Sequence, residues 1–293
     1  MNKRHALVSL NIAAFFFGLS GILGKVITTS PAAIVFGRAL FAVLALSLLM
    51  LGVRGFRWQR ISGGSALVVI GASAILAGHW LTFFISVKAS GVAIATLGFA
   101  SFPAFTTLFE SIGFRERISL NEILLIVLIC LGLMMVCPSF DISSGSTRGF
   151  LWGILSGALL ALLIICNRIT AISIRPVQAA LCQNAVICLL MLPFAFHALP
   201  QASAGDWFYL VLLGVFCTGV AHSLMVTSLR FVKARAAAVF FALEPVYAIL
   251  FAWALFGERP TPGMFAGAAV IIFSVTAFSR HDKKAPSPSE RQA

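Results

Sequence analysis

The chain has 293 residues, of which 60% are hydrophobic and 10% are charged, and its mean hydropathy is +1.02. This composition excludes a soluble domain, because no interior of this size could bury so much apolar surface, and it predicts a protein embedded in a lipid bilayer. The formal charge of +12 does not indicate nucleic-acid binding, because the Lys and Arg residues lie in short loops between apolar runs and form no patch.

Ten apolar runs follow one another along the chain, and each is long enough to cross a hydrocarbon core as a helix. Helices are expected because lipid offers backbone groups no hydrogen-bond partners, and no run alternates as a strand would. The sequence therefore predicts an all-α integral membrane protein with ten transmembrane helices, at residues 7–27, 32–51, 65–87, 92–112, 119–136, 149–171, 176–196, 207–229, 234–256 and 262–279.

The first run follows Lys3 and Arg4, as the apolar part of a signal peptide would. It is long enough to span a bilayer and shows no clear cleavage site, so we expect a retained first helix. Pro31 and Pro176 stand where helices two and seven should begin, which is a favoured position for proline.

The loops differ in positive charge from one side of the predicted membrane to the other. If the N-terminus is cytoplasmic, the loops on the opposite side contain only Lys25, Lys88, Arg148 and Arg259. Positively charged loops favour the cytoplasmic side, so both termini are expected there. The polar segment 280–293 is predicted to be a disordered cytoplasmic tail.

The second half of the chain repeats the first at an offset of 142 residues, which places Pro245 on Pro103 and Glu258-Arg259 on Glu116-Arg117. In each copy a proline interrupts an apolar helix near its middle, and a Glu-Arg turn leads into the next helix. Five helices per copy is an odd number, so the second copy should enter the membrane inverted. Inverted repeats with matched helix breaks, here expected at Pro103 and Pro245, are typical of secondary transporters.

These features resemble the drug/metabolite transporter superfamily, specifically its ten-helix transporters with two EamA domains. The resemblance is carried by Pro31 and Arg38 in helix two, by the two proline-interrupted helices and by the two Glu-Arg turns. It implies a first EamA repeat at residues 7–136 and a second at residues 149–279. It also implies a bacterial inner-membrane protein, and characterised members of the family include exporters of amino acids and other metabolites.

Arg38 lies within the second apolar run, where a charged side chain facing lipid would cost at least ~2.5 kcal/mol. We expect it to face the bundle interior and bind a substrate carboxylate, or else to hold the two halves together through a carbonyl or carboxylate, or to reach the membrane surface. Glu244 lies near the middle of helix nine, where a carboxylate should be paired or protonated. It would bind a substrate amine or a coupling proton, or bond to a polar group such as Gln183 or Asn184.

His79 and Trp80 lie at about the depth of Arg38 and are candidates for the same pocket, although a lone membrane histidine is more often a packing residue. His222 is the counterpart of His79 in the second repeat. Glu244, His79 and His222 are the candidates for proton coupling.

Two aromatic residues, Phe99 and Phe241, flank the helix breaks and are expected to line an apolar pocket. The remaining substrate-binding candidates are polar residues inside apolar runs, whose alternative role is hydrogen bonding between helices. These are Asn11, Gln183 and Asn184.

The six cysteines form no Cys-x-x-Cys pair and nearly all lie inside apolar runs, so we expect packing residues and no metal site. The chain also lacks a glycine-rich phosphate loop and a pair of carboxylates suited to hydrolysis, so we expect neither an enzyme nor a cofactor.

The sequence predicts a secondary transporter that exports small organic metabolites, above all hydrophobic or aromatic amino acids, by alternating access. Its expected partners are the small-molecule substrate, the lipid bilayer and a proton or other coupling ion, and it would act as a monomer or homodimer. The alternatives are an exporter or exchanger of nucleoside-like metabolites or drugs, and a non-transporting membrane scaffold or receptor.

Overall fold

The computed structural model describes residues 3–52, 58–114, 118–136, 141–170, 175–228 and 243–281. Within these ranges every regular element is a helix, as the composition predicts. Seven helical segments are long and apolar enough to cross a membrane, and three shorter apolar helices accompany them. These segments follow the ten predicted runs in order, so the predicted all-α membrane fold is confirmed.

The first half of the bundle contains six helices, because the fourth predicted run is divided in two. They are α1 (Lys3–Val26), α2 (Pro31–Gly52), α3 (Gly63–Ser90), α4 (Val92–Phe99), α5 (Phe102–Phe114) and α6 (Leu120–Val136). As expected, α2 begins at Pro31, whose missing N–H is not needed in a first turn.

The second half contains α7 (Gly145–Thr170), α8 (Pro176–Ala195), the short turn η1 (Leu199–Gln201), α9 (Ala204–Gly214), η2 (Val215–Val220), α10 (Ala221–Ser228), α12 (Glu244–Phe256) and α13 (Pro262–His281). The eighth predicted run thus consists of α9, α10 and a π-helical turn, η2, between them. The start of the ninth predicted run, 234–242, and residues 282–293 of the predicted tail lie outside the described residues, whereas residues 280 and 281 belong to α13.

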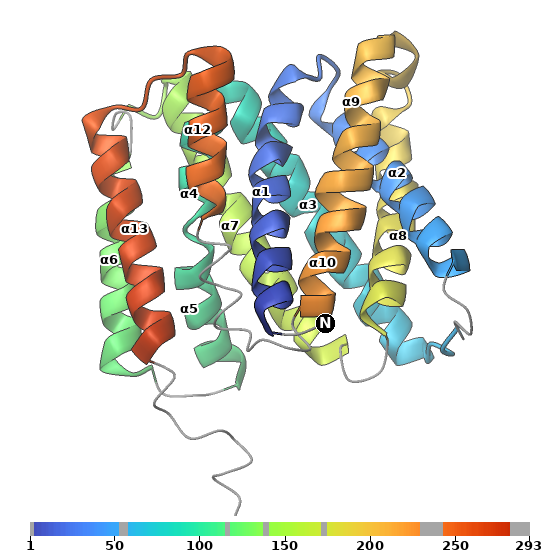
Figure 1. Cartoon of the computed structure of the whole chain (residues 1–293), viewed down its shortest axis with the longest axis horizontal. Coiled ribbons are helices and arrows are strands. Elements are labelled where there is room, and N and C mark those ends of the chain that lie inside the picture. The colour runs from blue at the N-terminus through green and yellow to red at the C-terminus, as the bar shows by residue number, and fades with distance from the viewer. Residues whose placement is uncertain are drawn as a thin grey trace, which may run out of the picture.

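The helix contacts are symmetric under an exchange of the two halves. Helix α7 of the second half packs against α3, α4 and α5 of the first, and α1 of the first half packs against α9, α10 and α12 of the second. Three further pairs join helices that occupy the same place in the two halves: α2 packs against α8, α4 against α12 and α6 against α13. Figure 1 shows α6 and α13 together at one edge of the bundle and α2 and α8 at the other. This exchange of equivalent contacts is consistent with an inverted repeat.

Glycines at a spacing of four residues let α7 approach α4 and the start of α5 closely. A Cβ atom on Gly153 would lie 2.8 Å from the carbonyl oxygen of Ala95, and one on Gly157 would lie 2.8 Å from that of Phe99. Small residues at this spacing are typical of membrane helices whose backbones are in contact. This packing fixes the end of α4 against α7.

The two interrupted helices restart at equivalent positions. Ala100 and Ser101 form a turn between α4 and α5, and α5 begins at Phe102. The helix α12 begins at Glu244, which is 142 residues further along the chain and so matches Phe102 in the repeat. Pro103 and Pro245 are each the second residue of the new helix, where an absent N–H leaves no helical bond unmade.

Candidate functional site

The two helix restarts both line a small pocket. It is lined by Phe99, Ala100, Phe102, Pro103, Pro245, Ile271 and Val275. Its cavity volume of about 10 Å³ is enough for about one water molecule. The pocket is therefore too small for an organic solute in this conformation.

Arg38 of α2 is buried, with 5% of its surface exposed. Its Nε donates to the hydroxyl of Thr218 at 2.7 Å, and its Nη1 donates to the hydroxyl of Ser20 at 3.1 Å. Its Nη2 donates more weakly, at 3.5 Å, to the carbonyl oxygen of Cys217. The guanidinium of α2 is thus bound to α1 in its own half and to η2 in the other half.

Trp80 of α3 forms one face of the same site. The guanidinium carbon of Arg38 lies 4.1 Å from the centre of the Trp80 ring, which is the geometry of a cation–π interaction. The preceding residue, His79, points instead toward α7, where its Nδ1 lies 2.8 Å from the hydroxyl oxygen of Ser156. That hydroxyl donates to the His79 carbonyl at 3.0 Å, so His79 joins α3 to α7.

The π-helical turn η2 explains how Thr218 reaches Arg38. The hydroxyl of Thr218 donates to the carbonyl oxygen of Leu213, five residues earlier, at 3.1 Å, so its oxygen is left to accept from Arg38. Just before this turn, a Cβ atom on Gly214 would lie 2.7 Å from the carbonyl oxygen of Arg38. Only glycine allows this approach of α9 to α2.

Glu244 starts α12 and is half-buried. The positive end of the helix favours a carboxylate at this position. The charge of Arg38 interacts electrostatically with Glu244, and also with His79 and His222. Arg38 and Glu244 do not form a direct ion pair, since among the described residues the only ion pair is the one between Lys25 and Glu258.

Aromatic rings connect this region to the break between α4 and α5. Phe99 lies 5.5 Å from the ring of His79 and stacks on Phe102 at 5.5 Å. On the other side of α1, Phe16 stacks on Phe216 at 5.8 Å. Phe99 lines the small pocket at the helix restarts, whereas Phe241 lies outside the described residues.

The other polar candidates do not all gather around Arg38. Asn11 accepts a hydrogen bond from the hydroxyl of Tyr247 at 2.8 Å, which joins α1 to α12. Gln183 and Asn184 are buried in α8. The Asn184 amide donates to the Ala180 carbonyl in its own helix at 2.8 Å, and its oxygen has no partner in the part of the chain that the structure describes.

Sequence reasoning missed Ser20 and Thr218, the two hydroxyl groups that bind Arg38. Both are polar residues inside apolar runs, as the selected candidates are. A serine or threonine hydroxyl in a helix can also bond to a backbone carbonyl of its own helix, so its presence alone does not indicate a site. The pairing of Ser20 and Thr218 with one guanidinium depends on three helices and was not visible in the spacing.

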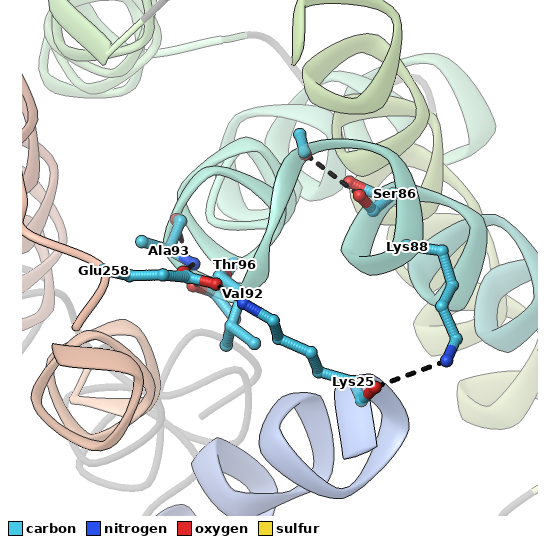
Figure 2. Close-up of polar contacts among 8 residues, drawn as sticks. Lys25, Ser86, Lys88, Val92, Ala93, Thr96 and Glu258 are labelled. Atoms are coloured by element: carbon cyan, nitrogen blue, oxygen red, sulfur yellow. Dashed lines mark hydrogen bonds and ion pairs between the residues drawn. The ribbon is translucent and has the colours of Figure 1, made fainter. Parts of the chain in front are cut away.

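One end of the bundle is closed by a cluster of charged contacts, which we call the Lys25 end (Figure 2). Lys25, in the last turn of α1, pairs with Glu258, which follows α12. Glu258 also accepts from the backbone N–H of Ala93 at 3.4 Å, in the first turn of α4. Lys88 of α3 donates to the carbonyl oxygens of Ile27 and Lys25, which lie at the end of α1. Four parts of the bundle are therefore joined at this end.

Gly91 makes room for Glu258 between α3 and α4. Its φ angle is +83°, and a Cβ atom there would lie 2.9 Å from a carboxylate oxygen of Glu258. Glycine is thus required at this position both by the positive φ angle and by the close approach of the Glu258 carboxylate. The repeat counterparts of Glu258-Arg259, Glu116 and Arg117, lie outside the described residues.

Comparison with known proteins identifies relatives that span nearly the whole chain. A model of the EamA-like transporter family matches residues 5–137 and 147–280. An uncharacterized transporter of Bacillus subtilis (strain 168), YxxF, is 24% identical over 92% of this chain and 90% of its own length. The pseudopaline exporter CntI of Pseudomonas aeruginosa is 26% identical over 93% of this chain and 95% of its own. One crystal structure shares the fold, with a TM-score of 0.65 over 97% of this chain and 100% of the other at 16% identity.

Proposed function

Because this chain belongs to the EamA-like transporter family, we propose that it exports small organic metabolites, above all hydrophobic or aromatic amino acids. Family membership makes the chain a multi-pass membrane transporter with a small-molecule substrate. The substrate class and the direction of transport are the parts that we propose.

The observation that carries the proposal is the environment of Arg38. Among the described residues the Arg38 guanidinium forms hydrogen bonds only to neutral groups, and a fixed positive charge in a low-dielectric region attracts an anion. A guanidinium presents its N–H groups in a planar fork that suits a carboxylate. We therefore assign the carboxylate of the substrate to Arg38.

Glu244 would provide the opposite charge. It interacts electrostatically with Arg38 without pairing with it, so a zwitterion could bridge the two groups through its carboxylate and its amine. Trp80 and Phe99 supply apolar surface nearby, which favours an apolar side chain on the substrate. Glu244, His79 and His222 remain the candidates for proton coupling, and Gln183, Asn184 and Asn11 remain secondary candidates for substrate contact.

The exchange symmetry of the two halves supports transport by alternating access. In this conformation the Lys25 end is closed and the pocket at the helix restarts has room for about one water molecule, so the proposed substrate site would form by movement of the halves. The positive charges of the loops support an orientation with the Lys25 end outside and both termini in the cytoplasm of a bacterial cell. Outward release would then require the Lys25 end to open.

Two alternatives predict different behaviour. An exporter or exchanger of nucleoside-like metabolites or drugs would transport solutes without a carboxylate, and its activity would not depend on Arg38. A non-transporting scaffold or receptor would need Arg38 only to hold α1, α2 and η2 together. The relative CntI is an exporter, which favours export over a scaffold or receptor.

The test is counterflow in proteoliposomes. Vesicles are loaded with one unlabelled amino acid at a time, from Trp, Phe, Met, Thr and Lys, and uptake of the labelled compound is followed. We expect exchange that is fastest for the apolar amino acids and that is lost in Arg38→Ala. Arg148→Ala, which removes an exposed arginine at the start of α7, should exchange as the wild type does.

Nucleosides and cationic drugs form the second panel. If the wild type exchanges these and no amino acid, while remaining monodisperse after purification, the amino-acid assignment is wrong and the transporter family stands. If Arg38→Ala exchanges amino acids at the wild-type rate, the assignment of the carboxylate to Arg38 is wrong.

A further inference from the structure

The hydrogen bonds of Arg38 leave part of its guanidinium free. A guanidinium has five N–H groups. The bonds to Thr218, Ser20 and the Cys217 carbonyl use one N–H on each of its three nitrogens. In the described part of the chain no further contact uses the second N–H of Nη1 or of Nη2. A carboxylate in a bidentate pair accepts two N–H groups, so the two that remain are enough to bind one.

Thr218 has the most restricted of the three contacts. A hydroxyl has one hydrogen, and that of Thr218 is donated to the carbonyl oxygen of Leu213. Toward Arg38 the Thr218 oxygen can therefore only accept, which suits a cation. The bond to Nε, at 2.7 Å, is the shortest that Arg38 makes, and Nε is the nitrogen that sets the plane of the guanidinium.

The π-helical turn makes this contact possible. The Leu213 carbonyl bonds to a hydroxyl five residues later, which is the spacing of a π-helix and not of an α-helix. The same turn presents the Cys217 carbonyl to Nη2. Thus η2 directs two successive oxygen atoms toward one buried cation, and π-helical turns occur frequently at functional sites.

The Trp80 ring restricts the guanidinium from a further direction. Its centre lies 4.1 Å from the guanidinium carbon, so the cation cannot move toward α3. An arginine side chain has several rotatable bonds, and holding it in one position before the ligand arrives removes an ordering cost from binding. Thr218 on one side and Trp80 on the other do this for Arg38.

We propose that Thr218 is a positioning residue that fixes the plane of the Arg38 guanidinium, so that its two free N–H groups meet the carboxylate of the substrate. This inference rests on the proposed function, because it assumes that Arg38 binds a carboxylate. It assigns to η2 a role in substrate selection: the site should distinguish a carboxylate from the corresponding amide.

The first experiment measures exchange kinetics for Thr218→Val, Thr218→Ser and Thr96→Val. Valine keeps the shape of threonine and removes the acceptor. We expect Thr218→Val to raise the KM of an amino-acid substrate about tenfold with its maximal rate within about twofold, and Thr218→Ser to restore the wild-type KM. Thr96 is equally buried, but its hydroxyl bonds only within α4, so Thr96→Val should leave the KM unchanged.

The amide of the same amino acid, used as a competitor, separates positioning from general damage. In the wild type the carboxylate should compete far better than the amide, and in Thr218→Val this preference should fall about tenfold. A KM that rises equally for both compounds, or a maximal rate that falls at constant KM, would show that Thr218 supports the fold and would overturn the proposal.

A second measurement needs no substrate and so separates this inference from the proposed function. In a background that keeps Trp80 and replaces the other four tryptophans by Phe, Trp80 fluorescence reports the stacked guanidinium. Thr218→Val should shift the emission toward that of Arg38→Met, and Thr218→Ser should not. An unchanged emission in Thr218→Val overturns the positioning role. A shifted emission in a protein that exchanges no amino acid supports the positioning role and refutes the proposed substrate class.

Discussion

Replacing Glu258 by Gln should weaken the contacts that close the Lys25 end. The carboxylate of Glu258 pairs with Lys25 and accepts from the N–H of Ala93 at 3.4 Å. Glutamine keeps the size of the side chain and one acceptor oxygen, so the bond to Ala93 can remain while the charge is lost. The change therefore acts on the ion pair between α1 and the segment that follows α12.

The exposure of the two side chains sets the size of the effect. The Lys25 side chain is 32% exposed and that of Glu258 is 21% exposed, so solvent screens the pair in part. Exposed ion pairs contribute about 0.2–1 kcal/mol of stability, and this pair should contribute about 1 kcal/mol because it is half-buried. If the pair exists only when the Lys25 end is closed, its loss should raise the population of the open state about fivefold.

Cys217 provides the assay. It is fully buried next to Arg38 and can be the only cysteine once the other five are replaced by Ala. The rate at which a membrane-impermeant maleimide labels Cys217 in spheroplasts should rise about fivefold in Glu258→Gln. The control Glu122→Gln should label at the parent rate, because Glu122 lies in the first turn of α6 and, among the described residues, its carboxylate accepts only from Ser119 just before that helix.

The double variant Lys25→Gln/Glu258→Gln should label no faster than either single variant, because both changes remove the same interaction. An unchanged rate in Glu258→Gln would refute a role of the pair in closing this end. An equal rise in Glu122→Gln would show that the label reports general loosening and not the ion pair.

Three further predictions concern packing and the Arg38 site. Gly153→Leu should lower the thermal midpoint by roughly 2–8 °C, because even a Cβ atom would lie 2.8 Å from a carbonyl oxygen of α4. The control Gly71→Leu should not lower it, because a Cβ atom at Gly71 meets no atom within 4 Å. Equal midpoints in the two variants would refute this reasoning. Asp206→Asn should lower the free energy of unfolding by about 2 kcal/mol in a denaturation series, because the Asp206 carboxylate accepts from the N–H and the hydroxyl of Thr28 at 2.6 and 2.8 Å. No loss of stability would mean that asparagine replaces both bonds. Trp80→Phe should raise the KM for exchange by roughly threefold, because phenylalanine is a weaker cation–π partner than tryptophan. Trp80→Leu should raise it by about tenfold, because leucine has no aromatic ring. Identical KM values in the two variants would exclude a cation–π contribution.

The fold was predictable because its determinants are periodic or repeated. Apolar runs of spanning length predict helices whatever their neighbours are. The 142-residue offset predicted that equivalent features would recur, and α5 and α12 do begin at positions with this separation. The division of the eighth run by η2 was not predictable in this way, because the hydropathy of Val215–Val220 is the same in an α-helix and in a π-helix.

The candidate site was predictable only in part. The cost of burying a charge indicated that Arg38 would face the interior, and it does, with 5% of its surface exposed. The same argument placed Glu244 in the bundle, where it interacts electrostatically with Arg38. It could not indicate whether the two would pair, because that depends on distances of a few ångströms between helices that are remote in sequence.

The partners of Arg38 show where the periodicity of a sequence stops being informative. A period of 3.6 residues assigns each side chain of an apolar run to a face of the helix. A π-helical turn contains more residues than an α-helical one, so the faces of the residues after it are displaced. Thr218 lies within such a turn, and its bond to Leu213 and its bond to Arg38 both depend on the displacement. A regular helix through this segment would turn the hydroxyl of Thr218 to another direction and leave Nε of Arg38 without this acceptor. The bond between Thr218 and Nε of Arg38 therefore arises from the one described segment in which the helical period changes to that of a π-helix. A polar residue in such an irregular segment is thus a better site candidate than its spacing alone suggests.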